Sequence, residues 1–195
     1  MRRAAVALTA LVVAACGGPD APAAGTDEVV GTSEAYTGTA MADHLHRQLG
    51  ILGTKMVELA EAMPEESYDW APMDGVRSVG AVFAHVAADN YYVPALLDRP
   101  VEGTGVTKDS GIRDYENARG PKADIVAELA RSFEEMDAAL SATREGLDRT
   151  VMLRENAITT GDLWVRAIVH LHEHLGQSIA YARANGVVPP WSGGG

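Results

Sequence analysis

The feature that most constrains the fold is two series of apolar residues spaced three or four positions apart. One such series lies at Leu45, Leu49, Leu52, Met56, Leu59 and Met63. A second series lies at Ile125, Leu129, Phe133, Met136 and Leu140. With 3.6 residues per turn, this spacing places each series along one stripe of a helix. Stripes of this kind are typical of helices that pack together, so the sequence predicts a helical bundle.

Residues that typically begin or end helices give the bounds of the first two helices. The first helix is expected over about residues 40–63, because Pro64 follows it and cannot continue a helix. Residues 64–77 read as an irregular connection. Ser78 then stands at an N-cap position and opens a second, mostly apolar helix that reaches about Leu97.

The second half contains two more helices. Pro121, a residue favoured in a first helical turn, opens the third helix, which continues to about Gly146. A linker leads to Thr160, the expected cap of the fourth helix, which ends at Asn185 before Gly186. The predicted fold class is therefore all-α, a four-helix bundle.

The segment between the second and third helices is long. Residues 98–120 contain several glycines and show no helical period. A loop of this length inside a compact domain is usually functional or crosses the fold. Either interpretation suits a bundle in which two consecutive helices run parallel and are joined end to end.

The start of the chain has the features of an export signal. Arg2 and Arg3 precede an apolar run over residues 4–15, which is too short to span a bilayer as a mature helix. The run ends in small residues before Cys16 and resembles a bacterial lipoprotein signal peptide, in which that cysteine becomes the lipidated first residue. The alternative is cleavage after Ala23, which would release a soluble exported protein.

These features predict three segments. Residues 1–15 are the expected signal peptide, residues 16–38 the lipidated cysteine and a flexible tether, and residues 39–191 the bundle. The expected location is extracytoplasmic, in the bacterial cell envelope, with the lipid anchor as the contact with the membrane. The sequence leaves the oligomeric state open.

Charge and cysteine content limit the partners. Without Arg2 and Arg3 the chain carries 27 acidic and 14 basic residues, so the net charge changes from −11 to −13. Such a surface disfavours nucleic acid and anionic lipid headgroups. Cys16 is the only cysteine, so the folded domain has no disulfide and no thiol of its own.

Two histidines in the fourth helix share one face. His170 and His174 are four positions apart and lie on a stripe with Leu163, Ala167 and Ser178. This is the stripe that a bundle helix turns inward. Imidazoles that face a core must each be hydrogen-bonded or bound, because an unsatisfied buried polar group costs roughly 1–3 kcal/mol. A metal ion would satisfy both.

The second helix offers a third candidate ligand, His85, in the middle of an apolar stretch. Asp89, one turn later, is a candidate acceptor that holds the His85 ring from outside the ligand set, or else a solvated carboxylate. His172 lies about 200° around the helix from the inward stripe and is left out. His44 and His46 are two positions apart and are expected in solvent.

Other metal motifs are absent from the sequence. There is no His-Glu-x-x-His motif, and no histidine has a glutamate three positions before it, as a di-iron bundle requires. A mononuclear three-histidine site remains. Three neutral imidazoles leave the metal its charge and an open position, which can lower the pKa of bound water toward about 7 or activate a thiolate. Any catalysis would therefore be centred on the metal, through bound water or a substrate thiol.

Two stretches, residues 59–91 and 170–190, resemble the DinB/YfiT-like bundle proteins. The matching positions are Trp70, Pro72, Ser78, His85, His170, His174, Gly176, Gln177, Arg183 and Gly186. Leu175 departs from the pattern, because the family often has a basic residue there. The resemblance implies an up-down-down-up bundle with residues 98–120 as the crossover. It also implies a divalent metal, often nickel or zinc, held by the three histidines.

Three functions stay open at this point. Family members that are understood are metal-dependent transferases or isomerases that use low-molecular-weight thiols. The first hypothesis is therefore a metal-dependent hydrolase or thiol-using transferase that acts on a small molecule outside the cytoplasm. The second is a tethered metal-binding module without turnover. The third is a structural bundle whose histidines are hydrogen-bonded in the core.

Overall fold

The computed structural model describes residues 38–193. The predicted signal peptide, Cys16 and the tether up to residue 37 lie outside the described residues. No described helix is both long enough and apolar enough to cross a lipid bilayer.

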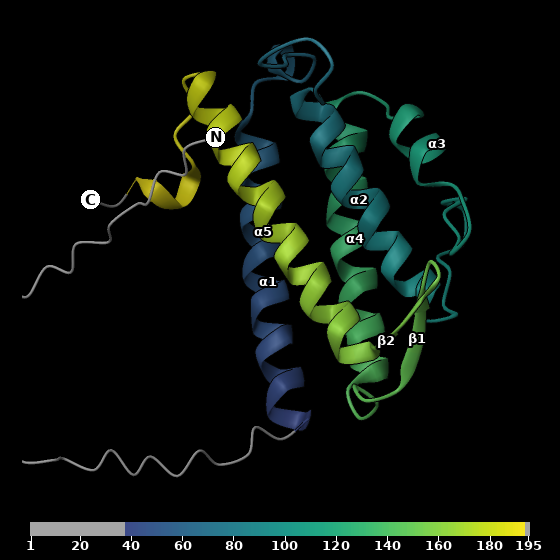
Figure 1. Ribbon diagram of the computed structural model, residues 1–195. Coiled ribbons are helices and arrows are strands. Elements are labelled where there is room, and N and C mark those ends of the chain that lie inside the picture. The colour runs from purple at the N-terminus through teal and green to yellow at the C-terminus, as the bar shows by residue number, and fades with distance from the viewer. Residues whose placement is uncertain (1–37, 194–195) are drawn as a thin grey trace, which may run out of the picture. The chain divides into compact units, whose positions relative to one another are not determined.

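Four long helices form the bundle: α1 (Gly38–Ala62), α2 (Val79–Leu96), α4 (Lys122–Thr143) and α5 (Thr160–Ala184). Figure 1 shows α1 and α5 running upward and α2 and α4 running downward. The predicted up-down-down-up bundle is therefore confirmed. Two contacts fix the antiparallel pairing of α1 and α4 at opposite ends. Lys122 Nζ donates to the Glu61 carbonyl at 2.7 Å, and Arg144 pairs with Asp43 at 2.5 Å.

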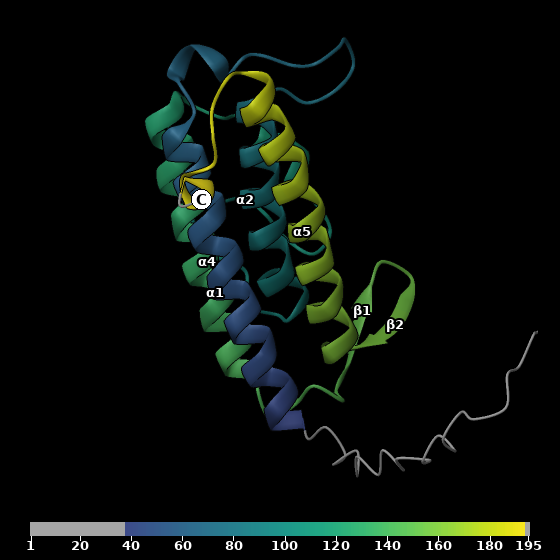
Figure 2. The same cartoon turned by 90° about the vertical axis from the view of Figure 1, so that its left-hand side faces the viewer.

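Helices that follow one another in the sequence are not all neighbours in space. α1 packs against α4 and α5, and α2 packs against the same two helices. α1 and α2 therefore lie diagonally opposite each other in the bundle, and α4 and α5 occupy the other two corners (Figure 2). α2 and α4 run parallel side by side, and the buried Asn90 side chain donates to Ser132 Oγ at 2.9 Å between them. The inward face of α5 consequently meets α2, the helix that carries His85.

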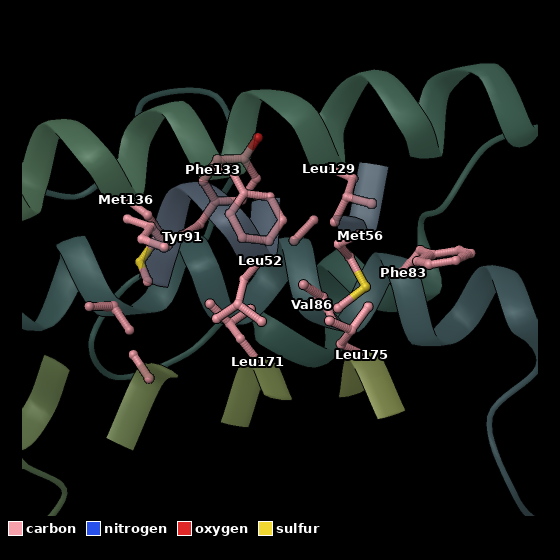
Figure 3. Packing of buried hydrophobic residues seen from close by; sticks show 14 of the residues in the cluster. Leu52, Met56, Phe83, Val86, Tyr91, Leu129, Phe133, Met136, Leu171 and Leu175 are labelled. Carbon is pink, nitrogen blue, oxygen red and sulfur yellow. The ribbon is translucent and has the colours of Figure 1, made fainter. Parts of the chain in front are cut away.

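The two predicted apolar stripes form the core. The six residues of the α1 stripe are at most 3% exposed, and the five residues of the α4 stripe at most 8%. Figure 3 shows Leu52 and Met56 of α1 facing Leu171 and Leu175 of α5. Burial of one such side chain stabilises the fold by roughly 1.5–3 kcal/mol, so these stripes hold the helices in register.

The caps of α2 and α5 were predicted with different success. Ser78 Oγ accepts from the Ala81 amide at 3.3 Å, as expected for the N-cap of α2. The N-cap of α5 is Thr159 rather than Thr160, so the predicted cap is wrong by one position. Thr159 and Asp162 form a reciprocal capping box. Thr160 instead donates its hydroxyl to the Arg149 carbonyl at 3.0 Å.

Two connections contain secondary structure that the sequence did not reveal. The crossover over residues 98–120 includes a short helix, α3 (Ile112–Asn117), which packs against α2. The linker before α5 folds into an antiparallel hairpin of β1 (Thr150–Leu153) and β2 (Asn156–Thr159). One-turn 3-10 helices, η1 (Glu65–Ser67) and η2 (Pro190–Ser192), follow α1 and α5.

Candidate metal centre

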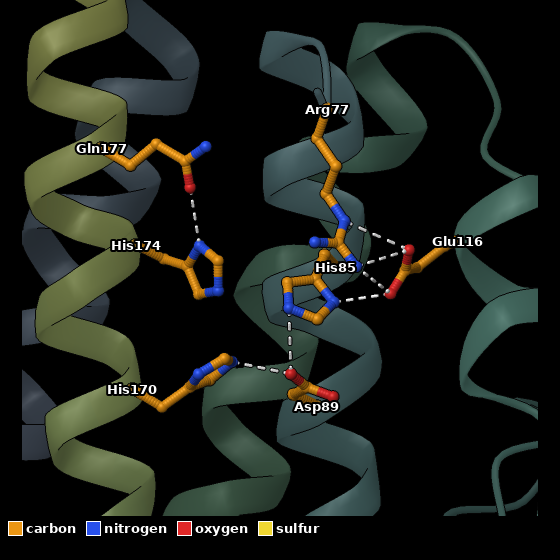
Figure 4. Close-up of polar contacts among 7 residues, drawn as sticks. All are labelled: Arg77, His85, Asp89, Glu116, His170, His174 and Gln177. Carbon is orange, nitrogen blue, oxygen red and sulfur yellow. Dashed lines mark hydrogen bonds and ion pairs between the residues drawn. The ribbon is translucent and has the colours of Figure 1, made fainter. Parts of the chain in front are cut away.

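The three predicted histidines meet between α2 and α5. One ring nitrogen from each of His85, His170 and His174 lies within 4.8 Å of the other two. The ring centroids are 4.4–5.4 Å apart. Figure 4 shows the three rings turned toward one another from the two facing helices. The four-residue spacing on α5 therefore presents two imidazoles to the one on α2.

A carboxylate from the crossover holds the outer nitrogen of His85. The Nδ1–H of His85 donates to Glu116 Oε1 at 2.5 Å, and Glu116 belongs to α3. Arg77 donates to both oxygens of Glu116 at 3.2–3.3 Å (Figure 4). The His85 side chain is only 12% exposed, so this pairing operates largely away from water. The ring is thereby fixed with Nε2 toward the other two histidines.

A chain of hydrogen bonds orients His174. Its Nδ1–H donates to Gln177 Oε1 at 2.9 Å, and the Gln177 amide donates to the Tyr181 hydroxyl at 3.0 Å. The Tyr181 hydroxyl donates to the Arg77 carbonyl at 3.3 Å, and Trp70 packs edge-on against the Tyr181 ring. The second nitrogen of His174 is left to face the centre.

The environment of His174 favours the neutral imidazole. Burial lowers the pKa of His174, the hydrogen bond that its ring donates to Gln177 works against this effect, and neighbouring His170 and His85 lower the pKa further. The neutral form is the one that binds a metal ion.

Asp89 lies on the side of the centre toward which the histidine rings point. Its Oδ2 is 2.7 Å from His170 Nε2 and 3.2 Å from His85 Nε2. The sequence suggested Asp89 as an acceptor for the His85 ring, and the structure brings the two side chains together, with Glu116 at the other ring nitrogen, Nδ1. Because it pairs with Nε2 of both rings, Asp89 is also within reach of a single ion that the two imidazoles would bind. It is a candidate fourth donor.

The donor set suits a divalent transition metal. Imidazole and carboxylate are ligands that zinc and nickel both accept. Bonds of about 2.0–2.1 Å place neighbouring nitrogens about 3.4 Å apart in a tetrahedral shell. The ring nitrogens lie within 4.8 Å of one another, so at most about 1.4 Å of closure separates them from this spacing, which is about the reach of a side-chain rotation. The residues present therefore fit a single bound ion.

The other described histidines lie outside the centre. His172 donates its Nδ1–H to the Ile168 carbonyl of its own helix at 2.9 Å. His46 pairs with Asp137 at 3.1 Å, and His44 is exposed. The sequence excluded all three from the ligand set, and the structure keeps them apart from it. His46 differs from the expectation only in having a partner on the surface.

Glu116 is the site residue that the sequence analysis missed. It lies in the segment expected to be an aperiodic loop, and α3 is only six residues long, too short to show a helical period. An acidic residue in a long loop was the only signal available, and such residues are common on surfaces.

The family relationship follows from comparison with known proteins. Residues 48–178, more than half of the chain, match the model of the DinB superfamily. This chain belongs to the DinB superfamily. The matched residues include most of the bundle and all three histidines.

Two solved structures of DinB-like proteins share this fold. One is from Bacillus cereus ATCC 10987, with 13% identity and a TM-score of 0.65 over 76% of this chain and 95% of the other. Another is from Bacillus subtilis, with 17% identity and a TM-score of 0.55 over 74% of this chain and 93% of the other. At these identities the likeness concerns the fold alone. No functionally curated protein matches the chain.

Proposed function

We propose that this DinB-superfamily protein binds one divalent metal ion, nickel or zinc, through His85, His170 and His174. The observation that carries the proposal is the convergence of one ring nitrogen from each histidine within 4.8 Å. Two of the three rings are also held at their outer nitrogens, by Glu116 and Gln177. Such an arrangement reduces the conformational freedom that binding must remove.

We further propose that the bound ion serves a reaction on a small molecule, as a hydrolase or as a transferase that uses a thiol. A divalent ion held by neutral imidazoles supplies Lewis acidity and lowers the pKa of a coordinated water or thiol. The chain itself supplies orientation, through Glu116 and Gln177. Asp89, whose side chain is 22% exposed, is the carboxylate that could hold a proton beside the His85 and His170 rings.

A non-catalytic role is the alternative, and one observation favours it. Each imidazole already has a polar partner without a metal: His85 has Glu116 and Asp89, His170 has Asp89, and His174 has Gln177. A bundle with such contacts satisfies its inward histidines without turnover. In that case the domain is a metal-binding or purely structural module.

The proposed setting comes from the sequence of the first segment. We propose that residues 1–15 act as an export signal and that a lipid on Cys16 tethers the domain to the membrane of the bacterial envelope, since two arginines and a short apolar run precede that cysteine. The proposed substrate is then a small molecule of that compartment.

Metal content of purified variants tests the proposal. His85→Ala, His170→Ala and His174→Ala should each remove most of the metal that the parent protein holds at one ion per chain. His172→Ala is the matched control, because it lies on the same helix and keeps the parent stoichiometry. Elemental analysis and titration with a chromophoric chelator give the readouts. Loss of metal from His172→Ala alone, or retention by all three ligand variants, would show that the centre is wrongly assigned.

A further inference from the structure

A groove opens directly beside the candidate metal centre. It has a volume of about 460 Å³ and includes Asp89 and His170 in its lining. Its other walls come from α2, α3, α5 and the turn of the β1–β2 hairpin, which lies beside the lower part of α5 (Figure 1). Pockets for small molecules span roughly 300–1,000 Å³. The groove therefore has the size for a small molecule with one end at the centre.

The walls of this groove are largely apolar. Val93 and Leu96 of α2, Ile112 of α3, Leu153 of β1 and Leu163 of α5 line it. All five are at least partly buried. Such walls favour a ligand with an apolar body, because burial of apolar surface drives its entry.

Charged groups stand among these walls. Arg154 and Arg166 are the two cations in the lining, and Asp89 and Glu173 are the two acids. Without a metal the charges of the two arginines and the two acids cancel. A divalent ion at the three histidines leaves the groove with a net charge of about +2, which favours an anionic ligand.

Arg154 has an unusual backbone for its residue type. It occupies the turn between β1 and β2 with a φ of 55°, in the left-handed region. Glycine or asparagine adopts this region at lower cost, whereas a long side chain there costs roughly 1 kcal/mol. Burial raises the pKa of Tyr92, a groove residue, and the nearby Arg154 opposes that rise. The turn thus holds a guanidinium close to the groove at some expense to local stability.

We propose that this groove binds the substrate of the metal centre, and that the substrate is a small organic acid with an apolar body. The inference rests on the proposed function. The apolar part lies along the walls between α2 and α5, and the carboxylate pairs with Arg154 at the hairpin turn. A guanidinium binds a carboxylate through two parallel hydrogen bonds, which also fixes the direction of the ligand.

The proposal can be tested by titration of the full zinc-loaded protein with phenylacetate, with binding monitored through the NMR chemical shifts of backbone amides. We expect saturable binding that shifts groove signals such as Leu153 and Tyr92. Phenylacetamide, the neutral analogue, should bind at least about threefold more weakly, the effect of one partly screened charge pair. Arg154→Asn tolerates the same backbone and should weaken phenylacetate by a similar factor. Arg47→Asn, at an exposed position on α1, should leave it unchanged.

Zinc content and melting temperature measured on the same samples separate the two proposals. If the parent holds zinc but binds acid and amide alike, or if Arg154→Asn has no effect, the groove proposal is overturned while the metal centre stands. If the parent holds no zinc, the proposed function fails. An Arg154-dependent preference for phenylacetate would then still support the groove, and its absence would overturn it.

Discussion

Glu116 Oε1 lies 2.5 Å from His85 Nδ1, so a six-residue helix in the crossover holds one ring of the candidate metal centre. Arg77, just before α2, holds the same carboxylate from the other side at 3.2–3.3 Å. A carboxylate on the outer nitrogen of a histidine fixes its tautomer and raises its strength as a ligand. The connection between α2 and α4 therefore takes part in the candidate metal centre.

Replacement of Glu116 should weaken metal binding without unfolding the bundle. Glu116→Gln keeps a similar shape but removes the charge, and we expect a roughly 10- to 100-fold loss of zinc affinity in a chelator competition. Asp114→Asn, on the same helix and exposed, is the control and should bind zinc like the parent. Equal affinity for the parent and Glu116→Gln would mean that Glu116 only packs the crossover against α2.

Two glycines of α1, three positions apart, should respond in opposite directions to substitution by alanine. Gly50 is exposed and a new Cβ there meets nothing within 4 Å, so Gly50→Ala should stabilise the protein by about 0.5–1 kcal/mol. A Cβ at Gly53 would lie 3.0 Å from the Phe133 ring, which should cost about 1–3 kcal/mol. Urea unfolding measures both. A stability gain in Gly53→Ala equal to that in Gly50→Ala would contradict the close packing of α1 on α4.

Alkaline pH should destabilise the fold. The hydroxyls of Tyr91 and Tyr115 both donate to Glu128 Oε2 at 2.9 Å. Burial, and after it the bond to Glu128, raises the pKa of each phenol well above its usual range. A raised pKa in the folded state leaves stability intact below about pH 10, the value of an unfolded tyrosine, and removes it at higher pH.

Urea unfolding between pH 8 and 11.5 checks this expectation. The free energy of unfolding should be level up to about pH 10 and then fall, by up to about 1.4 kcal/mol per pH unit for each such tyrosine. Tyr115→Phe should be less stable at pH 8, since it loses a hydrogen bond, and should show a shallower fall above pH 10. A profile that stays flat to pH 11.5 would be inconsistent with buried, hydrogen-bonded phenols.

The proposed lipid anchor at Cys16 can be tested separately. Cys16→Ser should abolish lipid labelling and membrane retention of the processed protein, because the cysteine sulfur is the proposed attachment point. Fractionation and intact mass of the mature protein give the readouts. An unchanged membrane fraction together with a mass that corresponds to cleavage after Ala23 would remove the lipoprotein interpretation and favour simple export.

The sequence predicted the four long helices because their periods are long and their ends are marked. The α1 stripe runs unbroken over six apolar residues, and Ser78 caps α2 as expected. The spacing of His170 and His174 likewise placed two rings on one inward face. The error at the start of α5 has a simple cause: Thr159 and Thr160 are chemically identical caps, and only the reach of Asp162 back to Thr159 distinguishes them.

The missed elements are short and depend on tertiary contacts. α3 has no buried residue and forms where Glu116 meets His85 and Tyr115 meets Glu128. Four-residue strands such as β1 and β2 are too short to show a period. The place of Asp89 could not be predicted either, because its contact with His170 depends on which face of α2 meets α5.

The pairing of α2 with α5 has a consequence for how metal and folding depend on each other. Asp89 and His170 touch although 81 positions separate them in the chain. An ion that joined the two helices would act as a reversible cross-link closing a loop of that size, for which the chain-entropy model gives about 4–5 kcal/mol. The unfolded chain keeps only the neighbouring pair on α5 and so binds metal weakly. Metal bound to the folded protein should therefore slow the separation of α5 from the bundle during unfolding, and removal of the metal by a chelator should loosen that helix first.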